Sequence, residues 1–141
     1  MAITSAICNS FKQEVLVEGH NLTNGADSIK LALYTSSATL GAGSTVYVTT
    51  GQSSGTNYSA GGQALTNVTP ALDGTVCVVD FADETFGTAT VTARGCLLYN
   101  STNGNKALCA IDFGGDKTST AGDFTVVFPS ASSSAAIIRL A

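Results

Sequence analysis

"LLYNSTNGNKALCAIDF", residues 97–113, contains two apolar runs on either side of a short polar segment. The runs are rich in Leu, Tyr, Ile and Phe, and aromatic and β-branched residues of this kind favour strands. Between them, Asn103-Gly104 supplies the residue types that tolerate a positive φ in a tight turn. The stretch therefore predicts an antiparallel hairpin with its tip at Asn103-Gly104.

Similar short runs occur along most of the chain, separated by clusters of Gly, Asn, Asp and Ser. They are residues 28–36, 45–50, 75–81, 89–99, 106–113, 123–128 and 135–141. Short strands at regular spacing, without helical segments between them, are typical of antiparallel sandwiches and barrels. We therefore expect an all-β fold, mainly an antiparallel β-sandwich of the jelly-roll kind.

Four stretches of the chain carry more detailed expectations. Ile29, Leu31 and Leu33 alternate with less apolar positions, which predicts a half-buried strand. Residues 76–81 are apolar on both faces, which predicts a central or covered strand. Pro70 is expected to end the preceding segment, with a turn at Asp73-Gly74. Residues 114–123, "GGDKTSTAGD", are expected to form a long connection between two strands.

Residues 1–19 form the one segment with a helical period. Apolar side chains recur four residues apart, and polar ones occupy most of the other positions. The pattern comprises Ile7, Phe11 and Val15, with Thr4 or Ser5 as the predicted cap and Gly19 as the stop. We expect one domain over residues 1–141, with an N-terminal helical segment at 1–19 and strands within 28–141.

The composition limits the classes of partner. Hydrophobic residues make up 44% and charged residues 11%, against roughly 25% charged in an average soluble protein. A surface of small polar and apolar groups, with little charge repulsion, favours a protein that works while associated. The net charge is −4, and the six Lys and Arg are scattered, so nucleic acid is not an expected partner.

No apolar run approaches the length of a membrane span, so a membrane is not an expected partner either. The first residues lack the basic opening and apolar block of a secretory signal. We expect the chain to be made and folded in a cytoplasm.

Cys8, Cys77, Cys96 and Cys109 have no metal-type spacing, and His20 is the only histidine. Small, buried, reduced thiols are the favoured interpretation, and disulfides within or between chains are the alternative. A strand would place Cys96 on the same face as Arg94, whose charge could activate the thiol, but packing is favoured.

The remaining candidates for chemistry are few. His20 follows the predicted helix end, and a structural or surface role is favoured. Asp80, Asp83 and Glu84 form the densest acidic group, which could serve a hydrolase or bind calcium, although a solvated strand end is favoured. No catalytic constellation emerges, so we expect no enzyme, no metal and no cofactor.

An ordered set of segments resembles a family of small virion structural proteins encoded by tailed bacteriophages. The set is "SAICNSFKQEVL", "IKLALYTSSATLGA", "NYSAGGQAL", "VDFADETF", "TARGCLLYN", "NKALCAIDFGGDKTSTAGDF" and "AIIRLA". "ICNSFKQE" followed by "LYTSSATLGA" carries most of the resemblance, which spans essentially the whole chain. The resemblance implies a head decoration or cement protein, assembled in the host cytoplasm and located on the head surface of the virion. Its partners would be the major capsid protein and copies of itself, as a dimer or trimer.

A protein of this kind needs contact surfaces rather than reactive groups. Small residues allow close backbone approach, and a tyrosine can anchor a contact at low entropic cost. We therefore expect subunit contacts at the N-terminal helix or along residues 56–65, involving Phe11, Tyr58, Ala60, Gly61 and Gly62.

Three alternatives remain open from the sequence. The first is a neck, tail or fibre-attachment component. The second is a host-glycan-binding module that stacks sugars on tyrosines. The third is a small glycosidase that uses Asp80 and Glu84. The tyrosines concerned are Tyr34, Tyr47, Tyr58 and Tyr99.

Overall fold

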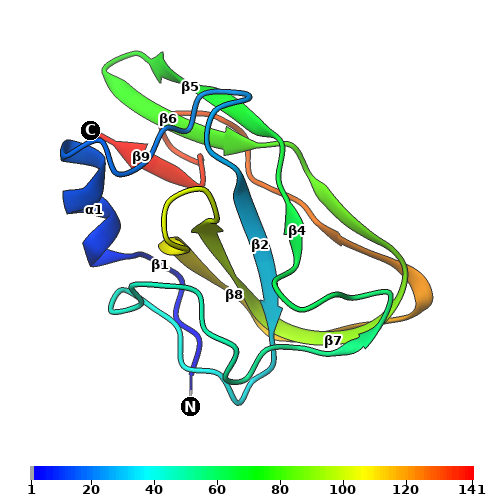
Figure 1. The fold of residues 1–141 in the computed structure, drawn as a ribbon. Helices are drawn as coiled ribbons and strands as arrows, with labels where there is room; N and C mark the ends of the chain where they lie inside the picture. The colour runs from blue at the N-terminus through cyan, green and yellow to red at the C-terminus, as the bar shows by residue number, and fades with distance from the viewer. Residues whose placement is uncertain (1) are drawn as a thin grey trace.

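The computed structural model describes residues 2–141 and consists of two antiparallel sheets and one short helix (Figure 1). The larger sheet has the strand order β1-β8-β7-β2-β4, with β3 also paired to β7, and the smaller has the order β5-β6-β9. In chain order the elements are β1 (Ala6–Ile7), α1 (Asn9–Leu16), β2 (Ile29–Tyr34), β3 (Gly55–Thr56), β4 (Gln63–Ala64), β5 (Asn67–Asp73), β6 (Val76–Phe81), β7 (Glu84–Asn100), β8 (Lys106–Val126) and β9 (Ile138–Leu140). The prediction of a mainly antiparallel, all-β fold with a short N-terminal helix is confirmed.

The hairpin predicted at residues 97–113 is present as the turn between β7 and β8, where Asn100 pairs with Lys106. The positive φ angles fall on Gly104 (63°) and Asn105 (57°), one position later than predicted. The loop has five residues rather than two, so the backbone reverses over a longer path. Asparagine tolerates this left-handed conformation better than most residues.

The prediction of a connection at residues 114–123 is wrong, because these residues belong to β8. Pairing with β7 is interrupted rather than ended: Asp112 pairs with Gly95 and Lys117 with Ala93, so β8 bulges outward between them. Gly114, with a φ of 80°, supplies the left-handed backbone within this bulge. Glycine and polar residues therefore mark an irregularity inside one long strand.

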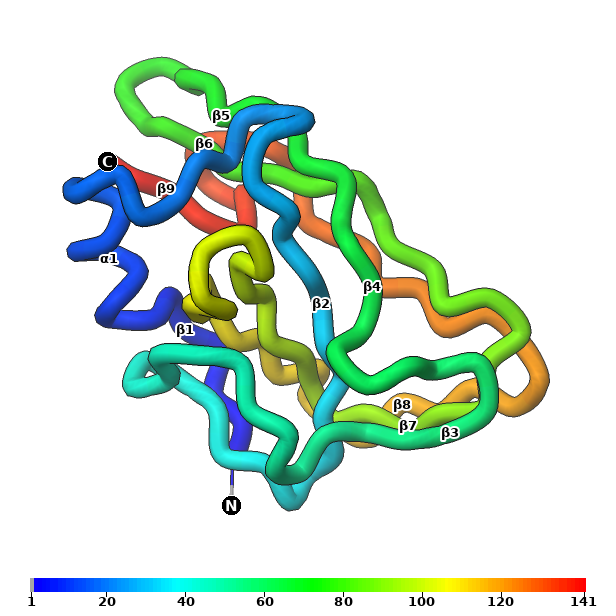
Figure 2. The backbone as a smooth tube through the Cα atoms, in the orientation of Figure 1, coloured from blue at the N-terminus to red at the C-terminus, as the bar shows by residue number. Residues whose placement is uncertain are grey.

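β2 is more deeply buried than its alternating pattern predicts. Leu31 to Tyr34 are all fully buried, because β2 lies between β7 and β4 and is covered on both faces. The predicted strand at residues 45–50 is also wrong, because only an isolated bridge from Val46 to Lys106 forms there. Figure 2 shows that this segment belongs to the long irregular path from β2 to β4.

The smaller sheet follows the sequence more closely. β5 and β6 form a hairpin at Asp73-Gly74, and β6 is the central strand, as predicted. Pro70 does not end a segment; it lies within β5, where the register shifts between Val68 and Ala71. A proline lacks the N–H of a regular ladder, so an interruption of the pairing accommodates it.

The helix begins later than predicted. Ala6 and Ile7 form β1 against β8, and α1 starts at Asn9 after Cys8, which makes no side-chain capping bond. The prediction of a cap at Thr4 or Ser5 is therefore wrong. The backbone before α1 is instead bonded to distant segments: the Thr4 N–H donates to the Leu40 carbonyl oxygen and the Cys8 N–H to the Leu108 carbonyl oxygen, so these groups are satisfied outside a helix.

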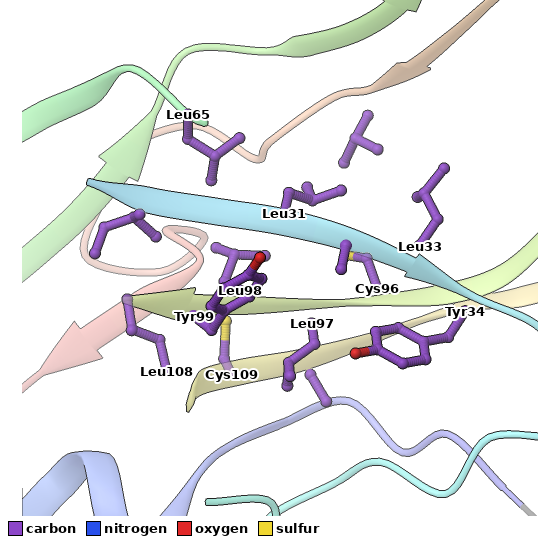
Figure 3. Close-up of a cluster of buried hydrophobic side chains, with 14 of the residues drawn as sticks. Leu31, Leu33, Tyr34, Leu65, Cys96, Leu97, Leu98, Tyr99, Leu108 and Cys109 are labelled. Atoms are coloured by element: carbon purple, nitrogen blue, oxygen red, sulfur yellow. The ribbon is translucent and has the colours of Figure 1, made fainter. Parts of the chain in front are cut away.

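One cluster of buried side chains draws on both sheets and on α1. Figure 3 shows its centre, where Leu31 and Leu33 leave β2 on the opposite side from Tyr34. Residues from the smaller sheet, Val79 and Ile138, belong to the same cluster. The two sheets therefore share one core.

Candidate functional site

The four tyrosines lie in or beside the irregular path from β2 to β4. Tyr34, Tyr58 and Tyr99 are buried, and Tyr47 is half-buried and stacks on Tyr99 with ring centroids 4.7 Å apart. The Tyr34 hydroxyl donates a hydrogen bond to the Val48 carbonyl oxygen at 2.5 Å. These rings attach residues 47–61 to the larger sheet.

Tyr58 and Gln52 hold the loop at residues 52–62 in place. The Tyr58 hydroxyl oxygen accepts a hydrogen bond from the Leu33 N–H at 2.8 Å. The Gln52 side-chain oxygen accepts the Gly61 N–H at 2.7 Å and lies 3.2 Å from the Tyr58 hydroxyl. The Tyr99 hydroxyl completes the set by donating to the Gly61 carbonyl oxygen at 2.6 Å. No sequence pattern singles out Gln52, which stands among ordinary turn residues.

Burial raises the pKa of Tyr58 and of Tyr99 to about 12, and it raises the pKa of Tyr34 still further. The cause is loss of water around the hydroxyl, which disfavours the charged phenolate. The hydroxyls of Tyr34, Tyr58 and Tyr99 therefore serve as neutral hydrogen-bonding groups within the chain. Three of the four rings are buried, so they are not open to a sugar in this arrangement.

The residues predicted to contact other subunits differ in how far they are exposed to solvent. Phe11 and Tyr58 are buried within the chain, and Gly61 is buried as well. Gly62 lies so close to the Leu31 carbonyl that a Cβ atom would collide with it, and its φ is 75°. Ala60 is exposed. Among these five, Ala60 alone presents an exposed side chain, and its role as a subunit contact stays a prediction.

His20 is a structural residue, with a side chain that is 0% exposed. Its Nε2 lies 2.9 Å from the Glu14 carboxylate, and its Nδ1 lies 3.1 Å from the Asn100 side-chain nitrogen. Because Asn100 donates, Nδ1 accepts and Nε2–H donates to Glu14. The same Asn100 nitrogen donates to Asp27 at 2.7 Å. This network ties α1 and residues 19–28 to the end of β7.

The acidic group at residues 80–84 is divided between strands and a turn. Asp80 lies in β6 opposite Val68, and Glu84 begins β7. Asp83, between them, accepts the Phe128 N–H at 2.9 Å. Burial raises the pKa of Glu84. Within residues 2–141, no group of three His, Cys, Asp or Glu side chains is placed to hold a metal ion.

The cysteines are free thiols; Cys8, Cys96 and Cys109 are buried and Cys77 is half-buried. Burial raises the pKa of Cys8 to about 11 and that of Cys109 to about 12. Arg94 does not activate Cys96, because its guanidinium lies 2.9 Å from Asp112 and outside the buried face.

Large apolar side chains on the surface are the feature that the sequence analysis missed. The five most exposed lie at element ends or edges: Leu16 (84%), Val17 (67%), Leu72 (73%), Val127 (71%) and Leu140 (44%). In addition, a hollow of about 430 Å³ lies beside β8 and the segment that follows it. Its apolar walls include Phe113, Phe124 and Phe128. Val127 lines this hollow, and an apolar surface with a hollow in it can bind another molecule.

Comparison with known proteins supplies no relative: no family model matches the chain, and neither a curated protein nor a solved structure matches it. In the part of the chain that is described, no helix combines the length and apolar character needed to cross a membrane.

Proposed function

We propose that this chain is a bacteriophage virion structural protein, specifically a decoration or cement protein that binds the outside of the major capsid lattice and stabilises the head. The proposal draws on the ordered resemblance to tailed-phage virion proteins. Its physical support is the set of exposed apolar side chains carried by a stiff antiparallel scaffold. Such a surface suits binding to other proteins.

The arrangement of the candidate chemical groups agrees with this role. The tyrosines and His20 are used to fix loops and the helix against the larger sheet. A rigid surface loses little conformational entropy when it binds, which favours contacts of modest area repeated many times. Several linked copies then bind more tightly through effective concentration.

Gold-labelled antibodies against the protein, counted on intact virions by electron microscopy, test the proposal. Label distributed over the head is the expected result, and heads lacking the protein should then burst at a lower temperature. Label confined to the neck or tail would contradict the cement role and favour another virion position. An absence of label from disrupted as well as intact particles would contradict the virion assignment itself.

A further inference from the structure

The buried side chain of His20 connects α1, the segment after it and the end of β7. Its Nε2 lies 2.9 Å from the Glu14 carboxylate on α1, and its Nδ1 lies 3.1 Å from the Asn100 side-chain nitrogen. That Asn100 nitrogen also donates to the Asp27 carboxylate at 2.7 Å. We call these four side chains the His20 network.

The side-chain amide of Asn100 is fixed in one orientation. Its Oδ1 accepts the Thr102 N–H at 3.0 Å and the Asn103 N–H at 3.2 Å, so its NH2 group faces the other way. Turning the amide over would place that NH2 group against two N–H groups of the hairpin loop. One of its hydrogens is donated to His20 and the other to Asp27. The amide therefore offers His20 a donor and no acceptor.

This orientation makes the network specific for a neutral imidazole. Nδ1 accepts the hydrogen bond from Asn100, so the single ring proton lies on Nε2 and is donated to Glu14. A second proton on Nδ1 would point at the Asn100 NH2 group, and two donors do not bond to each other. Because the His20 side chain is 0% exposed, water does not replace the lost bond while the network is closed.

The carboxylates around the ring provide a different partner once it is protonated. Glu14 approaches from α1 and Asp27 from residues 19–28, and among the described residues neither is in an ion pair with a Lys or Arg. Asp27 Oδ2 and His20 Nδ1 bond to the same Asn100 nitrogen, so a small movement of the ring brings Nδ1–H to Asp27. A hydrogen bond between two charged groups is stronger than one between neutral groups.

The other titratable groups near the network make no bond to the ring. β8 contributes Lys106, which lies across the hairpin from Asn100 and has no ion-pair partner within residues 2–141. Lys12 on α1 and Glu18 after it are both exposed. The Cys8 thiol stays neutral, because burial raises its pKa to about 11. The carboxylate beside Nδ1 is therefore the acceptor that a second ring proton meets first.

We propose that the His20 network is a pH-sensitive latch between the hairpin loop at residues 101–105 and the segment at residues 19–28. At neutral pH the ring accepts from Asn100 and the latch is closed. In mild acid, where histidine ordinarily becomes charged, the ring pairs with the two carboxylates and releases the Asn100 amide. The bonds from Ser101 and Thr102 to Ser28 remain, so the loop loosens without detaching. This inference goes beyond the proposed virion role and does not depend on it.

Nitrogen-15 NMR of the purified full-length protein, titrated from about pH 8 to about pH 5, tests the latch. At the upper end, His20 Nδ1 should show the shift of an unprotonated nitrogen and Nε2 that of a protonated one. The Asn100 side-chain protons should change with the same midpoint as the ring nitrogens. Across that midpoint, hydrogen exchange of the Thr102 and Asn103 N–H groups, corrected for its intrinsic pH dependence, should become about tenfold faster, because the oxygen that holds them is released.

Exchanging the two polar partners should reverse the response. In the double variant Asp27→Asn with Asn100→Asp, a carboxylate faces Nδ1 and the new amide still donates to it. The network then closes around the charged ring, so acid should slow exchange in the loop.

Two single variants separate the ring from its neighbours. Glu14→Gln is the matched control: its side-chain oxygen still accepts the Nε2–H but carries no charge, so the acid response should persist without titration of Glu14. His20→Gln removes the titrating ring and should abolish the response. Circular dichroism should show that each variant is folded, and the titration of the unmodified protein decides the matter if one is not.

Three results would overturn the inference. The first is a His20 ring that carries a proton on Nδ1 at about pH 8 or remains neutral down to about pH 5. The second is an Asn100 side chain and a loop that stay unchanged while the ring titrates, which would leave the network a purely structural one. The third is an acid response that survives His20→Gln. Antibody labelling of virions reports on the cement role separately, so either proposal can fail without the other.

Discussion

The β7–β8 hairpin has two halves that the same pair of strands builds in different ways. In the proximal half, Gly95–Asn100 paired with Lys106–Asp112, all six β7 residues are buried. In the distal half, Glu84–Ala93 paired with Lys117–Val126, burial alternates: Phe86, Ala89, Val91 and Ala93 are buried, and the residues between them are mostly exposed. Strands covered on both faces carry continuous apolar runs, and strands covered on one face alternate.

The exposed face of the distal half is built from threonines. The Thr85 and Thr125 hydroxyls are 2.9 Å apart, and so are those of Thr92 and Thr118. Cross-strand hydroxyl pairs and β-branched side chains stabilise a strand pair without an apolar cover. One hairpin therefore supplies both the centre of the core and a solvent-facing arm, and the change occurs at the bulge near Gly95.

The largest difference between the halves is expected for truncation of a buried side chain. Leu98→Ala should lower the free energy of unfolding by about 3–4 kcal/mol, because Leu98 is enclosed from both sides and a cavity would remain. Val91→Ala in the distal half should cost about 1–2 kcal/mol, since it removes fewer carbons and its site can relax toward the open side. Urea denaturation measures both values. Equal losses would mean that the arm is packed as tightly as the centre.

Two glycines of β7 give a matched second comparison. A Cβ atom at Gly95 would collide with the Ile111 carbonyl oxygen and lie 2.9 Å from Ile3 Cγ2, so Gly95→Ala should destabilise the fold by about 2 kcal/mol. At Gly87 the nearest atom is Asp123 Oδ1 at 3.9 Å, so Gly87→Ala should have no cost, or stabilise slightly by restricting the unfolded chain. Thermal unfolding of the two variants decides the matter, and a tolerant Gly95 would disprove the close packing proposed for the proximal half.

The smallest effect is expected on the exposed face of the arm. Thr92→Val removes the hydroxyl that bonds to Thr118 but keeps a β-branched side chain of the same shape. Because water can solvate the remaining hydroxyl, the free energy of unfolding should change by less than about 0.5 kcal/mol. Denaturant midpoints compared with those of the unmodified protein provide the measurement. A loss as large as that of Val91→Ala would show that the hydroxyl ladder, rather than the buried face, holds the arm together.

Part of the candidate site could be predicted from the sequence. The reduced state expected of the cysteines agrees with four free thiols, three of them buried. The structural role expected of His20 is confirmed by its bonds to Glu14 and Asn100. A single histidine and four cysteines without metal-type spacing are easy to recognise in a sequence. Because the chain has few charged residues, these side chains have few partners that could make them reactive, and a structural role is favoured.

The inward placement of Tyr58 and the exposure of Leu16 were not predictable in this way. Tyr58 reaches the Leu33 N–H only because residues 52–62 fold back on β2, a contact between residues 25 positions apart. Gln52 gains its importance through the same long-range geometry. Leu16, the last residue of α1, is 84% exposed, and the helical pattern of Ile7, Phe11 and Val15 did not predict this.

By itself, the sequence determined the all-β class, the hairpin at residues 97–113, the turn at Asp73-Gly74 and the central place of β6. These features depend on local backbone preferences and on the period of apolar residues, which short windows of sequence contain. Tertiary structure alone decided that residues 114–123 continue β8, that β2 is covered on both faces, and that residues 6–7 join a strand instead of the helix. In each case pairing or burial against residues far away in the chain outweighed the local preference, because unpaired backbone groups and exposed apolar area cost more free energy than a locally unfavourable conformation.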